Sequence, residues 1–380
     1  MKARAAGPLL AALGLTQILG WGSTYFLPGV LGAPIEAALD LPPGATFSGI
    51  ALQLGLAGLL APHAGRLIDR HGARRAMAVG SVLLATGLGL LALAQGPLGA
   101  LLACLVLGAG GALALTEAAN AALAVLGREG ARRRLGLVSV MSGFASVIAW
   151  PAFAWLEARH GWRGAVGAAA AVHLLVALPL HLWMLPAGPR GPRPLRAPAA
   201  SLPPRLRWLS AALTLQTLVG SAILANMVGL VGALGLSGEA AIFWAVLIGP
   251  AQVTARLLDL AGGARMSAVR LASFAMAAMP LALLLPLAAP GAIPLFIIAY
   301  GLASGLMSVL RPACLIEMHG TEGYATVAGR VMAPVTGAMA LGPALFAPLL
   351  ILAGAGPALM IAAALLGVGL LLLRRAARSA

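Results

Sequence analysis

The sequence has few charged residues. They make up 9% of its 380 residues, whereas 61% are hydrophobic. A soluble globular domain carries about 25% charged residues. A soluble core cannot absorb this much apolar sequence, but a bilayer can, because lipid is itself an apolar solvent. The hydrophobicity also excludes disorder, which requires apolar-poor sequence. The composition therefore predicts an integral membrane protein.

Acidic residues and cysteines are especially scarce. The chain has ten Asp and Glu residues and 25 Lys and Arg residues, which gives a net charge of +15. The arginines lie in short clusters between apolar runs and form no basic face with interleaved aromatics, so we expect no nucleic-acid partner. Cys104 and Cys314 lie within apolar runs and offer neither a disulfide framework nor a metal-binding spacing. No phosphate-binding loop followed by Lys and Ser or Thr occurs. We therefore expect no metal, no cofactor and no direct use of ATP.

Long apolar runs are abundant. A transmembrane helix needs about 20 apolar residues. The run that follows Lys2 and Arg4 exceeds the core of a signal peptide, so we interpret it as an uncleaved first helix. The rule predicts twelve spans, near residues 8–31, 46–67, 76–95, 98–124, 135–156, 164–185, 208–235, 239–261, 268–288, 292–316, 325–353 and 355–373.

The basic residues predict the orientation, since cytoplasmic loops are enriched in Lys and Arg. With a cytoplasmic N-terminus, 20 of the 25 basic residues lie in cytoplasmic segments, and only Arg159 and Arg163 lie in outside loops. Three more, Arg256, Arg311 and Arg330, fall within spans. We expect a multi-pass protein of a bacterial-type inner (plasma) membrane with both termini in the cytoplasm.

The two halves of the chain resemble each other. A Pro- and Arg-rich stretch at 186–207 follows the sixth span, and its prolines favour an extended cytoplasmic tether. It separates residues 1–185 from 208–380. Residues 10–20 resemble 210–220, and residues 66–75, RLIDRHGARR, resemble 256–265, RLLDLAGGAR. The predicted fold is an all-α membrane protein of twelve transmembrane helices in two pseudo-symmetric six-helix bundles, and we expect a monomer.

One loop carries a motif. After the second predicted span, residues 65–75 read GRLIDRHGARR. This segment resembles the signature loop of the major facilitator superfamily, G-x-x-x-D-R-x-G-R-R, in the same position between spans two and three. Ala73 departs from the pattern, where a basic residue is usual, and the pair Arg74 and Arg75 follows it.

Physical roles for this loop can be argued from its residues. Gly65 allows two helices to approach closely. Asp69 lies at a helix end, where it can pair with an arginine or cap the N-terminus of a neighbouring helix. Gly72 permits a tight turn. The resemblance implies a latch that holds the two halves together on the inside and breaks when the inside opens. Its residues would be Gly65, Asp69, Arg70, Gly72 and Arg74. If the loop only set the orientation of the chain in the membrane, it would need its arginines but neither Asp69 nor the glycines.

Polar residues within spans are costly in lipid, so they are expected to face a cavity or each other. Gln17, Trp21 and Tyr25 are spaced by four and share one face of the first span. Gln216 lies in the seventh span. In the superfamily, helices one, four, seven and ten line the cavity, and the resemblance therefore implies that these four residues line it. An interfacial aromatic belt fits Tyr25 but not Gln17.

Other polar residues leave alternatives open. Glu117 and Arg311 lie in the fourth and tenth spans, which are equivalent in the repeat. They could form a pair for proton transfer or gating, a static pair, or Arg311 could snorkel to the interface. His173 and His181 lie two turns apart in the sixth span, and we interpret them as helix-packing groups rather than a proton relay.

The eighth span contains Gln252 and Arg256. It resembles the monocarboxylate and oxalate porter branch, in which an arginine of helix eight binds a carboxylate. In monocarboxylate porters an aspartate precedes that arginine by four, and Gln252, whose amide does not titrate, stands here instead. The repeat offers a rival alignment that places Arg256 opposite Arg66, beside the latch. Asp259, three residues on, could also pair with Arg256.

The predicted function is secondary transport of a small molecule by alternating access, driven by an ion gradient, with a proton as the candidate coupling ion, or by the substrate's own gradient. Arg256 and Arg311 favour a small organic anion. The alternative substrate is a neutral or hydrophobic compound that is exported. A membrane-embedded enzyme would need a convergent nucleophile–base or metal cluster, and a receptor would usually carry a soluble domain. The sequence offers neither, so we do not expect an enzyme.

Overall fold

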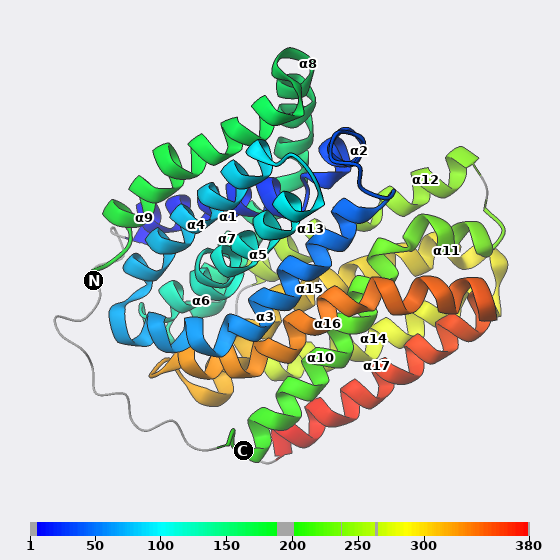
Figure 1. Ribbon diagram of the computed structural model, residues 1–380. Coiled ribbons are helices and arrows are strands. Elements are labelled where there is room, and N and C mark those ends of the chain that lie inside the picture. The colour runs from blue at the N-terminus through cyan, green and yellow to red at the C-terminus, as the bar shows by residue number, and fades with distance from the viewer. Residues whose placement is uncertain (1–5, 188–200, 237, 263–264, 379–380) are drawn as a thin grey trace. The chain divides into compact units, whose positions relative to one another are not determined.

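The computed structural model describes residues 6–187, 201–236, 238–262 and 265–378, and within these ranges the ordered elements are all helices (Figure 1). Ten helical segments among them are long and apolar enough to cross a membrane. One, Ala131–Met184, has 54 residues, far more than a single crossing needs. The count of twelve spans stays a prediction. Lys2, Arg4 and residues 188–200 of the predicted tether lie outside the described residues.

Two compact units make up the chain. Unit 1 contains Met1–Glu129, Leu137–Ala199 and Thr321–Ala333, and unit 2 contains Gly130–Gly136, Ala200–Gly320 and Pro334–Ala380. Two helices are therefore divided between the units: α7 (Ala131–Ser142) and α16 (Tyr324–Ala353). The domain limits drawn from the sequence, 1–185 and 208–380, remain a proposal.

Unit 1 is built from helices of the first half of the chain. Its further elements are α1 (Ala6–Thr24), α2 (Pro28–Ala38), α3 (Ala45–His71), α4 (Ala73–Leu93), α5 (Pro97–Ala114), α6 (Thr116–Ala124), α8 (Ala145–Val172), the π-helix η2 (His173–Ala177) and α9 (Leu178–Met184). Helices α4 and α5 pack through small residues, because a Cβ at Gly80 or Gly110 would lie 2.9 Å from a backbone nitrogen of the other helix. The long segment containing α8 reverses at Gly161, whose φ is 66°, and this reversal is visible at the top of Figure 1.

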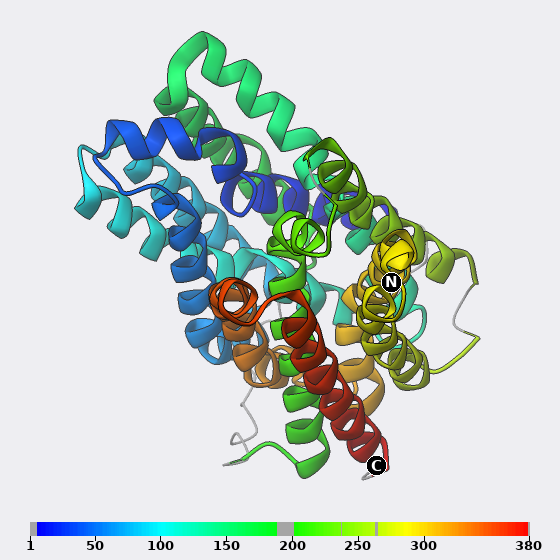
Figure 2. The ribbon, with the colours of Figure 1, turned by 90° about the vertical axis from the view of Figure 1, so that its right-hand side faces the viewer.

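Unit 2 is built from helices of the second half. Its further elements are α10 (Pro204–Ala225), α11 (Met227–Ala233), α12 (Gly238–Val246), α13 (Ile248–Gly262), α14 (Ala268–Ala288), the 3-10 helix η3 (Pro290–Ala292), α15 (Ile293–His319) and α17 (Ala355–Arg378). Helix α17 runs beside α10, as Figures 1 and 2 both show. Gly342 lies against the backbone of α10, where a Cβ would collide with the carbonyl of Leu218.

Several predicted spans are interrupted helices. The first span breaks after Thr24, the fourth at Leu115 and the seventh at Asn226. Leu115 adopts extended backbone angles, φ −87° and ψ −157°. Asn226 has φ −104° and ψ 13°, and its Nδ2 donates to the Ala222 carbonyl at 2.9 Å. Hydropathy averages over a window, so it does not detect such breaks.

The two buried histidines join helices. Nε2 of His173 lies 2.8 Å from the Ser23 hydroxyl of α1, and Nδ1 of His181 lies 2.8 Å from the Ser81 hydroxyl of α4. Both are contacts between packed helices, the kind of role expected from the sequence.

A carboxylate outside the predicted spans caps α3. Glu36 of α2 accepts hydrogen bonds from the Gly44 amide at 3.1 Å and from the amide and hydroxyl of Thr46 at 2.9 and 2.6 Å. The Thr46 hydroxyl and then its amide lower the pKa of Glu36 from its usual value. The ionised form of Glu36 therefore stabilises the folded state.

We expect acid to weaken this cap. A lowered folded-state pKa gives stability that is present above the unfolded pKa and is lost as the pH falls through the folded pKa. Thermal unfolding of the purified protein, measured across the acid range, should show less acid destabilisation in Glu36→Gln than in the wild type. Glu157→Gln makes the same chemical change elsewhere and should keep the wild-type profile. Identical acid profiles for Glu36→Gln and the wild type would rule the cap out as a pH-sensitive contact.

Candidate functional site

In unit 1, two side chains of α1 bind the break between α5 and α6. Gln17 Nε2 donates to the Ala114 carbonyl at 2.9 Å, and Trp21 Nε1 donates to the Thr116 hydroxyl at 3.1 Å. The Ala114 carbonyl ends α5, and a side-chain donor replaces the bond that a continuous helix would supply. Gln17 is only 1% exposed. The contact assigns it a part in shaping the break, and its expected place in a transport cavity stays a prediction.

Glu117 and two aromatic residues lie beside this break. Glu117 occupies the first turn of α6, where the positive end of the helix dipole favours a negative charge. Trp21 and Tyr25 pack edge to face, with ring centroids 5.8 Å apart. Both line a cavity of about 20 Å³ together with Gln53. That volume suits about one water molecule, so the cavity within unit 1 is too small for an organic substrate.

In unit 2, α13 and α15 are joined by a polar ladder. Gln252 Nε2 donates to the Ser304 hydroxyl at 3.1 Å, and one turn on Arg256 Nε donates to the Ser308 hydroxyl at 2.9 Å. Gly305 lies between the two serines and makes the approach possible, because a Cβ there would collide with the Gln252 backbone. The ladder fixes one edge of the Arg256 guanidinium.

A second arginine extends this polar cluster. Arg311 Nη1 of α15 donates to the Thr217 hydroxyl of α10 at 3.1 Å, and that hydroxyl lies 3.5 Å from Oε1 of Gln216. Arg311 follows Ser308, the partner of Arg256, by three residues on α15, so the two arginines act on the same stretch of that helix. Unit 2 thus gathers four of the sequence-predicted residues, Gln216, Gln252, Arg256 and Arg311. The other four, Gln17, Trp21, Tyr25 and Glu117, lie in unit 1.

Asp69 caps the N-terminus of α16 within unit 1. Its Oδ2 accepts from the Thr326 amide at 2.7 Å and its Oδ1 from the Ala325 amide at 3.3 Å. Two glycines bring the backbones together: a Cβ on Gly65 would collide with the Ala325 carbonyl, and a Cβ on Gly329 would collide with the Ala61 carbonyl. A carboxylate at unsatisfied helix amides makes charge-assisted hydrogen bonds, favoured by the helix dipole.

The remaining motif residues have different contacts. Gly72 adopts φ 85° at the turn between α3 and α4, a conformation that favours glycine. Arg74 Nε donates to the Leu185 carbonyl at 2.8 Å, at the end of α9. Arg70 is exposed and lines a pocket beside α5. Thus Gly65 and Asp69 contact α16, whereas Arg74 contacts α9.

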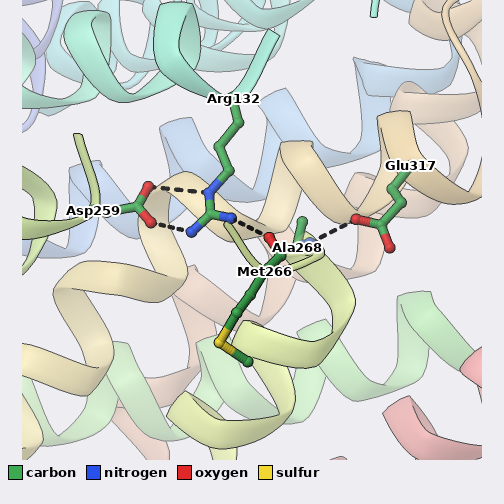
Figure 3. Close-up of polar contacts among 5 residues, drawn as sticks. All are labelled: Arg132, Asp259, Met266, Ala268 and Glu317. Atoms are coloured by element: carbon green, nitrogen blue, oxygen red, sulfur yellow. Dashed lines mark hydrogen bonds and ion pairs between the residues drawn. The ribbon is translucent and has the colours of Figure 1, made fainter. Parts of the chain in front are cut away.

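Unit 2 contains a matching contact that the sequence reasoning missed. Asp259 of α13 accepts hydrogen bonds from Nε and Nη2 of Arg132, at the start of α7 (Figure 3). Arg132 also donates to the Met266 carbonyl at 2.8 Å. Close by, Glu317 accepts from the Ala268 amide at 2.6 Å and caps α14. The repeat aligns Asp259 with Asp69 and so indicates an equivalent contact, but its partner, Arg132, is not near it in the sequence.

The sequence and the fold resemble known proteins. The sequence profile of the Major Facilitator Superfamily matches residues 13–343. The structure is similar to that of the human organic anion transporter MFSD10, with a TM-score of 0.77 and 18% identity over 98% of this chain and 100% of that one. It is also similar to the E. coli fucose:proton symporter FucP, with a TM-score of 0.73 and 19% identity over 97% and 98% of the two chains.

A third similar structure is the proton:xylose symporter XylE, with a TM-score of 0.72 and 14% identity over 97% of this chain and 94% of that one. No curated protein sequence matches the chain. At these identities the structural likenesses establish the fold alone.

We expect Asp69→Asn to release the start of α16 from α3. The change keeps the shape but removes the charge, and a hydrogen bond to a charged group contributes about 1.5–3 kcal/mol. Such a loss shifts a two-state equilibrium about tenfold or more. A single cysteine in place of Trp21, which the sequence predicts to line the cavity, in a background without Cys104 and Cys314, should therefore react faster with an impermeant maleimide applied from the predicted cytoplasmic side.

Asp40→Asn is the matched control, because Asp40 is exposed and asparagine tolerates its φ of 51°. It should label at the wild-type rate. If Asp69→Asn also labels at the wild-type rate and expresses normally, the cap does not control access.

Proposed function

The chain belongs to the major facilitator superfamily, and from that premise we propose that it moves a small organic anion across the membrane by alternating access. Membership makes it a multi-pass membrane transporter rather than an enzyme. The further elements of the proposal are the substrate class, the groups that bind it and the contacts that set the direction of opening. Both termini in the cytoplasm and twelve spans are part of the same proposal.

The observation that carries the substrate class is the arginine pair of unit 2. Arg256 and Arg311 place two guanidinium groups on one polar cluster of α10, α13 and α15. A guanidinium can hold a carboxylate through two parallel hydrogen bonds, so this cluster suits an anionic substrate. The bond from Arg256 to Ser308 orients the guanidinium in advance, which lowers the entropy lost on binding. Similarity to a protein named as an organic anion transporter supports the same class.

The monocarboxylate and oxalate porter branch is the narrower proposal. Arg256 stands where that branch has its carboxylate-binding arginine. Gln252 bonds to Ser304 and cannot titrate, so it would hold the α13–α15 ladder rather than carry a proton. We assign a coupling proton to Glu117, the carboxylate beside the break in the fourth span. Two of the similar structures are named as proton symporters, which supports a proton as coupling ion.

Alternating access needs contacts that form in one state and break in another. We assign this role to the Asp69 cap on α16 and to the Arg132–Asp259 pair. The helices that receive these contacts, α16 and α7, are the two divided between the units. Each contact lies within one unit but holds a helix that continues into the other unit, so a movement of one unit against the other would act on it through that helix.

A panel of compounds tests the substrate class. We expect carboxylates, and not lipophilic cations or neutral compounds, to raise the unfolding temperature of the purified protein. Arg256→Lys keeps the charge but loses the bidentate hydrogen bonding of a guanidinium, so it should weaken carboxylate binding. Arg256→Gln should weaken it by about tenfold or more, as expected for loss of a charged hydrogen-bonding partner.

Arg207→Gln removes an exposed arginine of α10 and should bind carboxylates normally. The anion proposal fails if the stabilising compounds are cationic or neutral, which would favour export of such compounds. It also fails if Arg256→Gln binds carboxylates as the wild type does, and Arg256 would then be a structural residue near the latch.

A further inference from the structure

A pocket of about 420 Å³ lies between α3 and α5 in unit 1. The volume falls within the roughly 300–1,000 Å³ range of ligand sites. Four basic side chains of α3 line it, His63, Arg66, Arg70 and His71. Its other lining residues among those described are apolar, and include Ala109, Ala112 and Leu113 of α5. The pocket therefore combines a positively charged end with an apolar wall of small side chains.

The pocket opens on the side of α3 that faces away from α16. Gly65 and Asp69 contact α16, whereas His63, Leu67 and Arg70 are exposed on the opposite face of the helix. Leu59, one turn before His63, is 75% exposed. Leu59 thus places an exposed apolar surface next to the basic side chains of the pocket. A ligand with an anionic head and an apolar tail would match both.

The charge on this face changes along the helix. Exposed leucines precede the pocket, and basic side chains occupy the end of α3, which the arginine distribution predicts to be cytoplasmic. His63 and Arg70 are about 10 Å apart along the axis, at 1.5 Å per residue. That span suits a phosphodiester with its glycerol, and the small residues of α5 leave room for an acyl chain beside them.

We propose that this pocket binds an anionic phospholipid of the cytoplasmic leaflet. The phosphate would lie between Arg66 and Arg70, with His63 and His71 as further donors, and an acyl chain would follow Ala109 and Ala112. Guanidinium groups match phosphate oxygens in charge and geometry. Basic pockets between spanning helices on the cytoplasmic side are the usual setting for bound anionic headgroups. The site uses residues of unit 1 alone, none of them part of the proposed substrate site, and does not depend on the transported substrate.

Lipid retention tests the proposal. The purified protein is incubated with mixed micelles of phosphatidylglycerol and phosphatidylcholine, and the retained lipid is counted by native mass spectrometry. We expect phosphatidylglycerol to be retained over phosphatidylcholine. Arg66→Gln should lower this preference about fivefold, as expected for one arginine near an anionic headgroup. Ala112→Trp should abolish it without changing the charge, because the indole fills the wall of the pocket.

Arg133→Gln provides the control, since it removes an exposed arginine of α7 and the same unit of charge. It should retain lipid as the wild type does, and all variants should elute as single folded species. Glycerol phosphate distinguishes a lipid headgroup from a water-soluble phosphate ester. It should not displace the lipid, because it lacks the acyl chain.

Three results would overturn the site: no preference for phosphatidylglycerol, equal losses in Arg66→Gln and Arg133→Gln, or full retention in Ala112→Trp. Displacement by glycerol phosphate would replace it with a water-exposed phosphate site.

Discussion

The contact on which much of this structure depends is a charged side chain at the end of a helix. Helix ends leave amides and carbonyls without partners in the helix itself. This chain satisfies several of them with its scarce charges. Carboxylates meet amides at the starts of three helices: Glu36 at α3, Glu317 at α14 and Asp69 at α16. Arginines meet carbonyls at two ends: Arg74 beyond α9 and Arg163 at Ala94, beyond α4.

Charges placed in this way do two things at once. They stabilise helix ends through the dipole, and they connect elements that are far apart in the sequence. Asp69 and Asp259, equivalent in the repeat, both act at the end of a helix, yet by different chemistry. Asp69 caps backbone amides, whereas Asp259 pairs with the Arg132 side chain. A cap made with backbone survives changes in the residues that supply the amides, while a side-chain pair depends on both partners.

The sequence predicted the family, which the superfamily profile confirms over residues 13–343, and the location of the motif between α3 and α4. It gave the cap as one of two roles for Asp69, because a carboxylate at a helix end can either pair with an arginine or cap a neighbouring helix, and the structure shows the cap. It could not predict that Arg74 would bind the end of α9, because that depends on where a distant helix ends. The break at Leu115 was missed since hydropathy carries no information on backbone angles. The ladder of Ser304 and Ser308 was missed because serines within a helix are common, and only Gly305 between them hinted at a close neighbour.

We propose that the two units exchange between two arrangements, and that the carboxylates at the ends of α3 and α13 set the balance between them. Electron–electron double resonance tests it directly in bilayers. Spin labels replace the exposed residues Arg75 and Arg270, one in each unit, in a background without Cys104 and Cys314. The account predicts two distance populations, with the longer one enriched when Asp259 is changed to Asn and enriched further when Asp69 is changed as well. A single distance that neither change alters would contradict it.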